Sequence, residues 1–532
     1  MYACISNACA VPGAAMATPK PRWVQGEWPW PGARRTPARC SSSGGPPPPQ
    51  LPIRRSANYQ PNSWNYGSME SLAAEHDALM NRTAAFLTNS LIPVVQVDPP
   101  SFDKLKFYVR HLLLREVELL PKLRTIDTVQ RLGVAYHFDE EISAILNSVS
   151  VEGQDIDRRD DVHLMTLLFR LLRQNNSPSS PELLLRSLKD GTGNFKKMLH
   201  KDAEGLLSLY EASHLAFEGE ALLDEARVFS TEALRELMPS MHPHLRSYVD
   251  NALAVPLHWA APRLQARWFI DHYAEDVEAD QVLLRFAKLD FNKVQKLHQQ
   301  ELSRITRWWR NADLNKSLPF ARDRLMECFY FATGVAWEPT LAACREVVAK
   351  AFSLIVVLDD IYDIYGTLDE LVAFTNAIER WEATATEQLP EYMKAIYLAI
   401  FNFSNEVADD IQRKNGFDAR FLLKNVVSRE ELKRGDAPSS IAIYMFEKGA
   451  MEHDARKAMR DLTMETWKIV NQDVSNNSHY PPSFANVCVN MARISHCIYQ
   501  GGDGISAPND GKKMEISELF LEPLKVNQDR HN

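Results

Sequence analysis

Hydrophobic residues recur at helical spacing through most of the chain from about residue 65 onward. The segments 204–238 and 280–309 follow this period, and no segment shows the sustained alternation that is typical of a strand. A third stretch carries apolar side chains three or four positions apart and is closed by Pro121: Leu105, Val109, Leu112, Leu113, Val117 and Leu120. No unit repeats at a fixed period. The pattern predicts an all-α protein.

Two prolines indicate where this helical chain divides. Pro256 and Pro262 lie in a connection between two helical blocks, and proline is disfavoured inside a helix. We therefore expect a domain boundary near residue 260, with one helical domain over residues 54–260 and a second over residues 261–532. A chain of 532 residues is long enough for two such domains.

Residues 1–53 differ from the rest of the chain. They hold 11 of the 30 prolines and a single acidic residue, Glu27. Their basic residues are Lys20, Arg22, Arg34, Arg35 and Arg39. Acid-poor leaders that contain Arg and Ser are typical of organelle transit peptides. The leader predicts a plastid protein, and the alternative is a disordered tail or a mis-assigned start on a cytoplasmic one.

Composition excludes several classes of protein. A net charge of −9 argues against a nucleic-acid binder, which would carry a basic patch. No apolar run approaches the ~18 residues that a membrane span needs. The seven cysteines are scattered, with neither the spacing of a zinc site nor that of a disulfide framework, so we expect a reducing compartment.

The strongest candidate chemistry lies at residues 359–363. Asp359, Asp360 and Asp363 follow the apolar run 351–358, and carboxylates beside a core are costly unless a cation balances them. On a helix, Asp363 lies three and four positions after the other two, so the three side chains can converge on one ion. Hard oxygen ligands suit Mg²⁺, which also keeps waters and substrate phosphates. The cluster predicts a magnesium site that binds a diphosphate, and a solvated acidic surface is the alternative.

Two groups of arginines accompany this cluster. Arg322 and Arg324 precede Asp359 by about 35 positions, and the planar guanidinium suits bidentate phosphate contact. A surface ion pair around Asp323 is the alternative interpretation. Arg54-Arg55, followed by eight residues and a tryptophan, forms the second group.

Taken together these segments resemble a plant class I terpene synthase. The resemblance rests on residues 54–61, 209–213, 217–220, 267–270, 320–324, 359–371 and 431–436. It implies two α-helical domains, an N-terminal relic α-barrel and a C-terminal class I terpenoid synthase helical bundle that holds the active site. It also implies that a metal cluster ionises a prenyl diphosphate and leaves an allylic carbocation in a dry apolar pocket.

The resemblance implies a role for each candidate residue. Asp359, Asp360 and Asp363 match the first metal-binding motif, and Arg322 and Arg324 would hold the departing diphosphate. An N-terminal strap over the pocket would be formed by Arg54, Arg55 and Trp64. Phe329, Tyr330 and Phe331 would offer aromatic faces to the cation. Tyr499 and Asp503 match a C-terminal loop that closes the pocket.

The sequence departs from the family pattern in its last third. Of the second metal motif only Glu431 matches, since Leu423, Lys424 and Val427 stand at the other ligand positions. Between Phe417 and Asn425 the resemblance implies a further segment of roughly 60 residues, about four or five helices of typical length. Loss of these helices would remove metal ligands and leave apolar faces exposed.

Three hypotheses follow. The first is a Mg²⁺- or Mn²⁺-dependent monoterpene synthase that ionises geranyl diphosphate, and we expect it to be a monomer. The second is a catalytically defective isoform that lacks the second metal motif. The third is a sesquiterpene synthase that uses farnesyl diphosphate, which a cytoplasmic location would favour. A prenyl-elongating enzyme would need two Asp-rich motifs, and the chain shows one.

Overall fold

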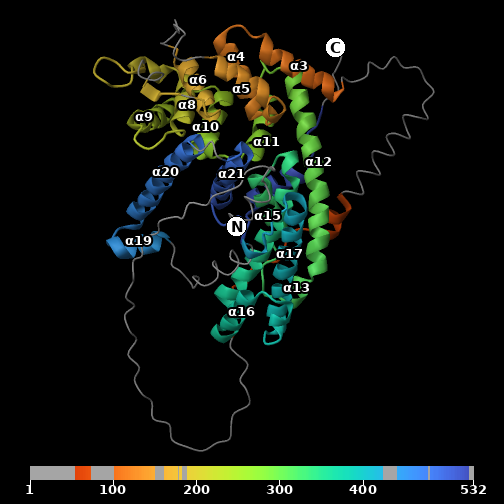
Figure 1. The fold of residues 1–532 in the computed structure, drawn as a ribbon. Helices are drawn as coiled ribbons and strands as arrows, with labels where there is room; N and C mark the ends of the chain where they lie inside the picture. Colours follow the sequence, from red (N-terminus) through yellow and green to blue (C-terminus); the bar gives the residue numbers. More distant parts are fainter. Residues whose placement is uncertain are drawn as a thin grey trace, which may run out of the picture.

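The computed structural model describes residues 54–72, 101–149, 161–177, 179–182, 188–422, 440–476 and 480–526. Within these ranges the chain is helical, and the only pairing outside helices is an isolated bridge between Lys189 and Phe195. Figure 1 shows one group of helices from the first half of the chain above a second group from the second half. The predicted all-α fold is confirmed. The leader 1–53 lies outside the described residues.

Among the described residues, eight helices that precede position 274 pack together. They are α3 (Phe102–Arg115), α4 (Leu119–Arg131), α5 (Asp139–Ser148), α6 (Val162–Gln174), α8 (Ala203–Ser213), α9 (Ala221–Leu237), α10 (Pro243–Ala254) and α11 (Pro262–Tyr273). The stretch 105–120 is not one helix closed by Pro121, because α3 ends at Arg115 and Val117 is 92% exposed. Pro121 instead stands in the first turn of α4, where no intrahelical N–H bond is lost.

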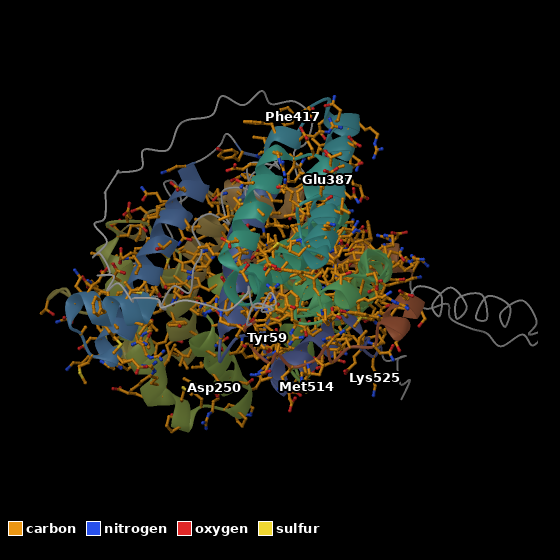
Figure 2. The ribbon with its side chains drawn as sticks, turned by 90° about the horizontal axis from the view of Figure 1, so that it is seen from below. Tyr59, Asp250, Glu387, Phe417, Met514 and Lys525 are labelled. Carbon is orange, nitrogen blue, oxygen red and sulfur yellow. The ribbon has the colours of Figure 1, made fainter. Side chains whose placement is uncertain are left out.

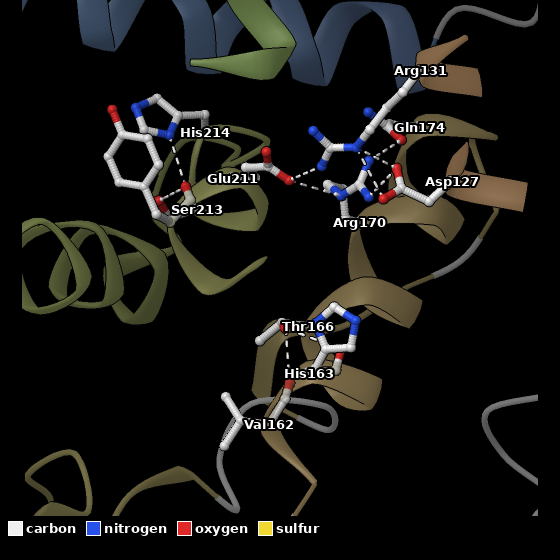
Figure 3. Close-up of polar contacts among 11 residues, drawn as sticks. Asp127, Arg131, Val162, His163, Thr166, Arg170, Gln174, Glu211, Ser213 and His214 are labelled. Carbon is white, nitrogen blue, oxygen red and sulfur yellow. Dashed lines mark hydrogen bonds and ion pairs between the residues drawn. The ribbon is translucent and has the colours of Figure 1, made fainter. Parts of the chain in front are cut away.

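A buried ionic cluster joins three of these helices (Figure 3). Arg131 of α4 and Arg170 of α6 both contact Asp127, at 3.0 and 2.6 Å. Arg131 also pairs with Glu211 of α8. Arg170 is 2% exposed and Glu211 3% exposed. Removal of one partner from such a buried network leaves another charge uncompensated, so the cluster ties α4, α6 and α8 together.

The second half is built around α14 (Leu325–Val335), in which every residue is buried. This helix packs against α15 (Ala342–Asp360) and α21 (Pro482–Tyr499). The surrounding helices are α12 (Gln281–Ala312), α13 (Leu314–Ser317), α16 (Leu368–Arg380), α17 (Glu391–Asn415) and α22 (Asp510–Phe520). A Cβ at Gly334 would lie 2.3 Å from the Ile494 side chain, so α14 and α21 approach closely only because this residue is glycine. In the described part of the chain no helix is long and apolar enough to cross a bilayer.

Two further helices lie at the side of this bundle. In Figure 1, α19 (Ser440–Lys448) and α20 (Glu452–Asn476) lie beside the lower edge of the first-half helices. Lys468 of α20 pairs with Asp224 at 2.8 Å, which fixes α20 to α9. None of the residues of α19 is buried, and Phe446 is 91% exposed. Part of the apolar surface of α19 is therefore exposed within the described residues.

Candidate active site

The aspartate cluster lies where α15 changes its winding. Asp359 and Asp360 are the last residues of α15, and Asp363 belongs to a π-helical turn, Ile361–Tyr365. The N–H of Gly366 donates to the Ile361 carbonyl at 2.8 Å, which closes this wider turn. A Cβ at Gly366 would lie 2.9 Å from that carbonyl oxygen and 2.7 Å from Leu371 Cδ2, so glycine is required here. Single π turns occur frequently at functional sites.

The three aspartates do not share one environment. Asp360 is 1% exposed, and its Oδ2 accepts a hydrogen bond from the backbone N–H of Arg322 at 2.6 Å. Its Oδ1 lies 2.8 Å from Arg322 Nη2. Asp359 and Asp363 are only partly buried. Asp359 and Asp363 are therefore the more accessible carboxylates at this helix end, and the Asp360 carboxylate is turned inward to the Arg322 guanidinium.

The donor set fits part of a magnesium site. Within the described ranges no three Asp, Glu, His or Cys side chains are grouped closely enough to hold a metal ion on their own. Mg²⁺, however, takes one or two carboxylates and completes its octahedron with waters and substrate phosphates. Asp359 and Asp363 supply such a pair. Beside them, Arg322 Nε is a buried N–H that has no acceptor among the residues the structure describes, and an incoming phosphate oxygen would satisfy this donor.

The two predicted arginines anchor a C-terminal loop. Arg322 Nη1 donates to Ser506 Oγ at 2.6 Å, and Arg324 Nη2 donates to the Ser506 carbonyl at 2.9 Å. Asp503 shapes the same loop, because its Oδ1 accepts the N–H groups of Ile505 and Ser506 at 2.9 and 2.8 Å. Burial opposes ionisation of Asp503, but the bonds from Ser506 outweigh it and lower its pKa. Tyr499 stands at the loop's edge and is 59% exposed.

The N-terminal strap reaches the same place from the other end of the chain. Arg54 Nη2 donates to Glu370 Oε1 at 2.8 Å, and Arg54 Nη1 donates to the Tyr365 carbonyl at 3.0 Å. Arg55 Nη2 donates to the Asp363 carbonyl at 2.9 Å. Trp64 Nε1 donates to Glu327 Oε1 at 2.9 Å. The strap predicted from Arg54, Arg55 and Trp64 is therefore seated on the aspartate end of α15 and on α14.

Asp323 joins several segments through hydrogen bonds, a role that the sequence interpretation missed. It is not a surface ion pair, because it accepts Trp309 Nε1 at 3.0 Å and Asn315 Nδ2 at 2.6 Å. The hydroxyl of Tyr66 also donates to it, which draws in the strap. Its position between Arg322 and Arg324 was the signal in the sequence, and of its three partners named here only Tyr66 lies far away along the chain.

Tyr59 is a second residue that the sequence interpretation missed. Its ring lies 4.7 Å from the Arg322 guanidinium. Burial, together with the negative charge of Asp360, raises the pKa of Tyr59 to about 12. Figure 2 shows Tyr59 against the second-half helices, far from Phe417 at the outer end of α17. The phenol therefore stays protonated beside the inward aspartate and its arginine.

The three aromatic residues of α14 differ in what they face. Phe329 packs on Phe520 with ring centroids 5.1 Å apart, and the Tyr330 hydroxyl bonds Glu515. Phe331 instead faces Phe352 of α15 at 4.5 Å. Phe331 therefore lies against α15, the helix that ends in the aspartates. Glu431, the remaining predicted metal ligand, lies outside the described residues.

Comparison with known proteins assigns the family. The terpene synthase N-terminal domain matches residues 66–253, and the metal-binding domain of the terpene synthase family matches residues 310–429. The chain is 34% identical to the chloroplastic alpha-thujene synthase of Litsea cubeba, over 92% of this chain and 94% of that protein. That alignment extends over 566 positions, more than the 532 residues of this chain, so the relative holds positions without a counterpart here.

Two solved structures share the fold. Isoprene synthase from grey poplar (Populus x canescens) leaves, in complex with three Mg²⁺ ions and dimethylallyl-S-thiolodiphosphate, matches with a TM-score of 0.74 and 33% identity, covering 87% of this chain and 99% of that chain. Limonene synthase with 2-fluorolinalyl diphosphate matches with a TM-score of 0.79 and 28% identity, covering 89% of this chain and all of the other. With two matched domains and relatives that align over most of its length, this chain belongs to the terpene synthase family.

Proposed function

We propose that this terpene synthase ionises geranyl diphosphate with Mg²⁺ and forms a monoterpene in the plastid. The observation that carries the proposal is the pair Asp359 and Asp363 at the π-helical turn, covered by the Arg54 strap and flanked by the unsatisfied Nε–H of Arg322. The thujene synthase is named chloroplastic, and both thujene and limonene are ten-carbon terpenes, which supports the compartment and the substrate length.

Different residues of the site would bind the ion, bind the departing diphosphate and exclude water. Asp359 and Asp363 would hold the ion, which when bound supplies positive charge to the departing diphosphate. Arg322 is positioned by Asp360 and Ser506, so its Nε–H points at a fixed place as the diphosphate leaves. The strap and the 503–506 loop meet on Arg324 and cover the site, which excludes water from the carbocation. Phe331, which packs against Phe352 of α15, would supply an aromatic face to the carbocation.

Several finer assignments belong to the same proposal. Mn²⁺ is the alternative ion, since both are hard cations that accept carboxylate ligands. Glu431 would add a ligand from the second motif. We place the domain boundary near residue 260, in the connection between α10 and α11, and we expect a monomer.

A non-catalytic isoform is the second candidate. Two observations favour it: the longer relative in the alignment, and the apolar helix α19 with no buried residue. In that case the strap and the aspartate end are retained but the pocket lacks a wall.

Product formation decides between the candidates. The chain is incubated with geranyl and then farnesyl diphosphate in Mg²⁺ or Mn²⁺, and volatiles are analysed by gas chromatography, with Asp363→Ala as control. A C10 product that disappears in the control supports the monoterpene synthase. A C15 product alone supports the farnesyl alternative. A folded chain without any product supports the defective isoform.

A further inference from the structure

A cavity of about 280 Å³ lies away from the aspartate site, between the first-half helices and α20 and α21. Small-molecule sites in proteins begin at about 300 Å³, so this cavity suits a small ligand. Its wall is unusually cationic. Four arginines line it, from α4, α6 and α21: Arg131, Arg170, Arg173 and Arg493.

Three of these arginines have their charge balanced. Arg131 and Arg170 share the carboxylates of Asp127 and Glu211 (Figure 3). Arg173 Nη2 contacts Glu220 Oε1 at 2.8 Å. Three arginines thus face three carboxylates, and the positive charge of the fourth, Arg493, has no carboxylate to balance it among these residues.

Arg493 is held by neutral groups. Its Nε donates to the His258 carbonyl at 2.7 Å, its Nη1 to Asn490 Oδ1 at 2.9 Å, and its Nη2 lies 3.2 Å from His258 Nδ1. A guanidinium has five N–H donors, so two remain after these three contacts. Among the described residues no carboxylate lies within 4.0 Å of it. Burial lowers the pKa of Arg493 to about 10, yet the group stays charged at neutral pH.

The neighbours of Arg493 do not supply the missing negative charge. His258 lies 2.7 Å from Asn471 Oδ1 through Nε2, so that nitrogen carries the proton and Nδ1 accepts from Arg493. Burial lowers the pKa of His258 to about 3, which keeps the ring neutral. Arg170, which also lines the cavity and is 2% exposed, has a buried Nε–H that lies 3.7 Å from Glu211 Oε2 and has no hydrogen-bond acceptor among the described residues. The cavity therefore combines one uncompensated cation with a second unsatisfied donor.

We propose that this interdomain cavity binds a small oxyanion, a phosphate or carboxylate group, with Arg493 as its charge partner and Arg170 as an additional donor. Two oxygens of such a group match the two remaining N–H donors of a guanidinium fork. The site is separate from the diphosphate chemistry at Asp359, and it does not depend on the chain being catalytically active.

Thermal unfolding of the full chain tests the proposal. Phosphate, diphosphate and acetate are each compared with chloride at equal ionic strength, since a ligand that binds the folded state raises Tm. We expect at least one oxyanion to raise Tm, to do so equally in Arg322→Gln, and to lose the effect in Arg493→Gln while Arg493→Lys keeps part of it. The size of the Tm rise with phosphate and diphosphate, compared with that in acetate, shows whether the site prefers a phosphate group or a carboxylate group. A rise that survives Arg493→Gln overturns the proposal.

A crystallographic measurement covers the case in which Arg493→Gln does not fold. Wild-type crystals are soaked in selenate, and the anomalous signal of selenium locates the anion. A peak between Arg493 and Arg170 supports the site. A peak at Arg322 alone, or no peak in the cavity, overturns it.

Discussion

Arg54 donates to both carboxylate oxygens of Glu370, a residue 316 positions further along the chain. Glu370 also accepts the N–H of Thr367 at 3.0 Å in a capping box at the start of α16, and the Tyr392 hydroxyl at 3.0 Å. A bidentate, charge-assisted pair of this kind is among the stronger polar contacts in proteins. The strap is therefore attached to the end of a helix that directly follows the aspartate turn.

Loss of this pair should release the strap. Glu370→Gln removes the charge that holds Arg54, so amide protons of residues 54–66 should exchange with deuterium at least ~10-fold faster, the equivalent of about 1.4 kcal/mol. Asp369→Asn is the matched control, because Asp369 is exposed and stands on the same turn. Equal exchange in the two variants would show that Glu370 does not hold the strap.

The same pair gives the strap a pH dependence. The pKa of Glu370 is lowered from 4.5 to about 2, chiefly by the hydrogen bond from Arg54. A carboxylate with a depressed pKa stabilises the folded state fully above its unfolded pKa and loses that contribution as pH falls through the folded value. The difference in unfolding free energy between wild type and Glu370→Gln should thus be constant above about pH 5 and shrink between pH 4.5 and 2. Urea titrations at a series of pH values measure it, and a difference independent of pH would contradict the assignment.

The aspartates should separate activity from stability. Asp363→Ala should abolish product formation with little change in Tm, since the side chain is partly exposed. Asp360→Asn should lower unfolding free energy by about 3–5 kcal/mol, because it leaves the buried guanidinium of Arg322 without its charge partner. Thermal melts and gas chromatography on both variants check this. The reverse pattern, a stable Asp360→Asn and an unfolded Asp363→Ala, would contradict the assignment of Asp363 to activity and of Asp360 to stability.

The π turn should not tolerate a side chain at Gly366. An added Cβ would stand 2.9 Å from the Ile361 carbonyl, so Gly366→Ala should cost about 1–3 kcal/mol of stability, as overpacking generally does. Gly416→Ala is a useful comparison, because no atom lies within 4 Å of the Cβ position there although φ is +69°. Tm values of the two variants decide whether close approach or backbone strain dominates; a smaller loss in Gly366→Ala would contradict the steric account.

The exposed face of α19 should affect association more than stability. Phe446 is 91% exposed, so Phe446→Ser should change unfolding free energy by less than about 0.5 kcal/mol. It should reduce concentration-dependent aggregation, measured by light scattering after size-exclusion chromatography. Unchanged scattering in the variant would show that this face does not drive self-association.

Much of the fold could be predicted from local pattern. The 3.6-residue period of 280–309 corresponds to α12, Gln281–Ala312, because one long amphipathic face needs no distant information. The error at Pro121 arose because proline is compatible with both a helix end and a helix beginning, and only the exposed Val117 shows which applies.

The site was predictable in kind but not in detail. That Asp360 points inward was visible in principle, since Val356 and Val357, four and three positions earlier, are buried on the same face. The contacts of Asp323 with Tyr66 and of Arg54 with Glu370 were not predictable, because they join residues 257 and 316 positions apart. Local period carries no information about such pairings.

The strap also sets a limit on how the chain can be trimmed. Its first anchoring guanidinium is Arg54 and its second is Arg55, directly after the proline-rich leader. A protease that removes the leader must cut on the N-terminal side of Arg54. A cut only two bonds later would remove Arg54 and Arg55, and with them the contacts to Glu370 and the Asp363 carbonyl, so the strap limits any trimming of the N-terminal residues.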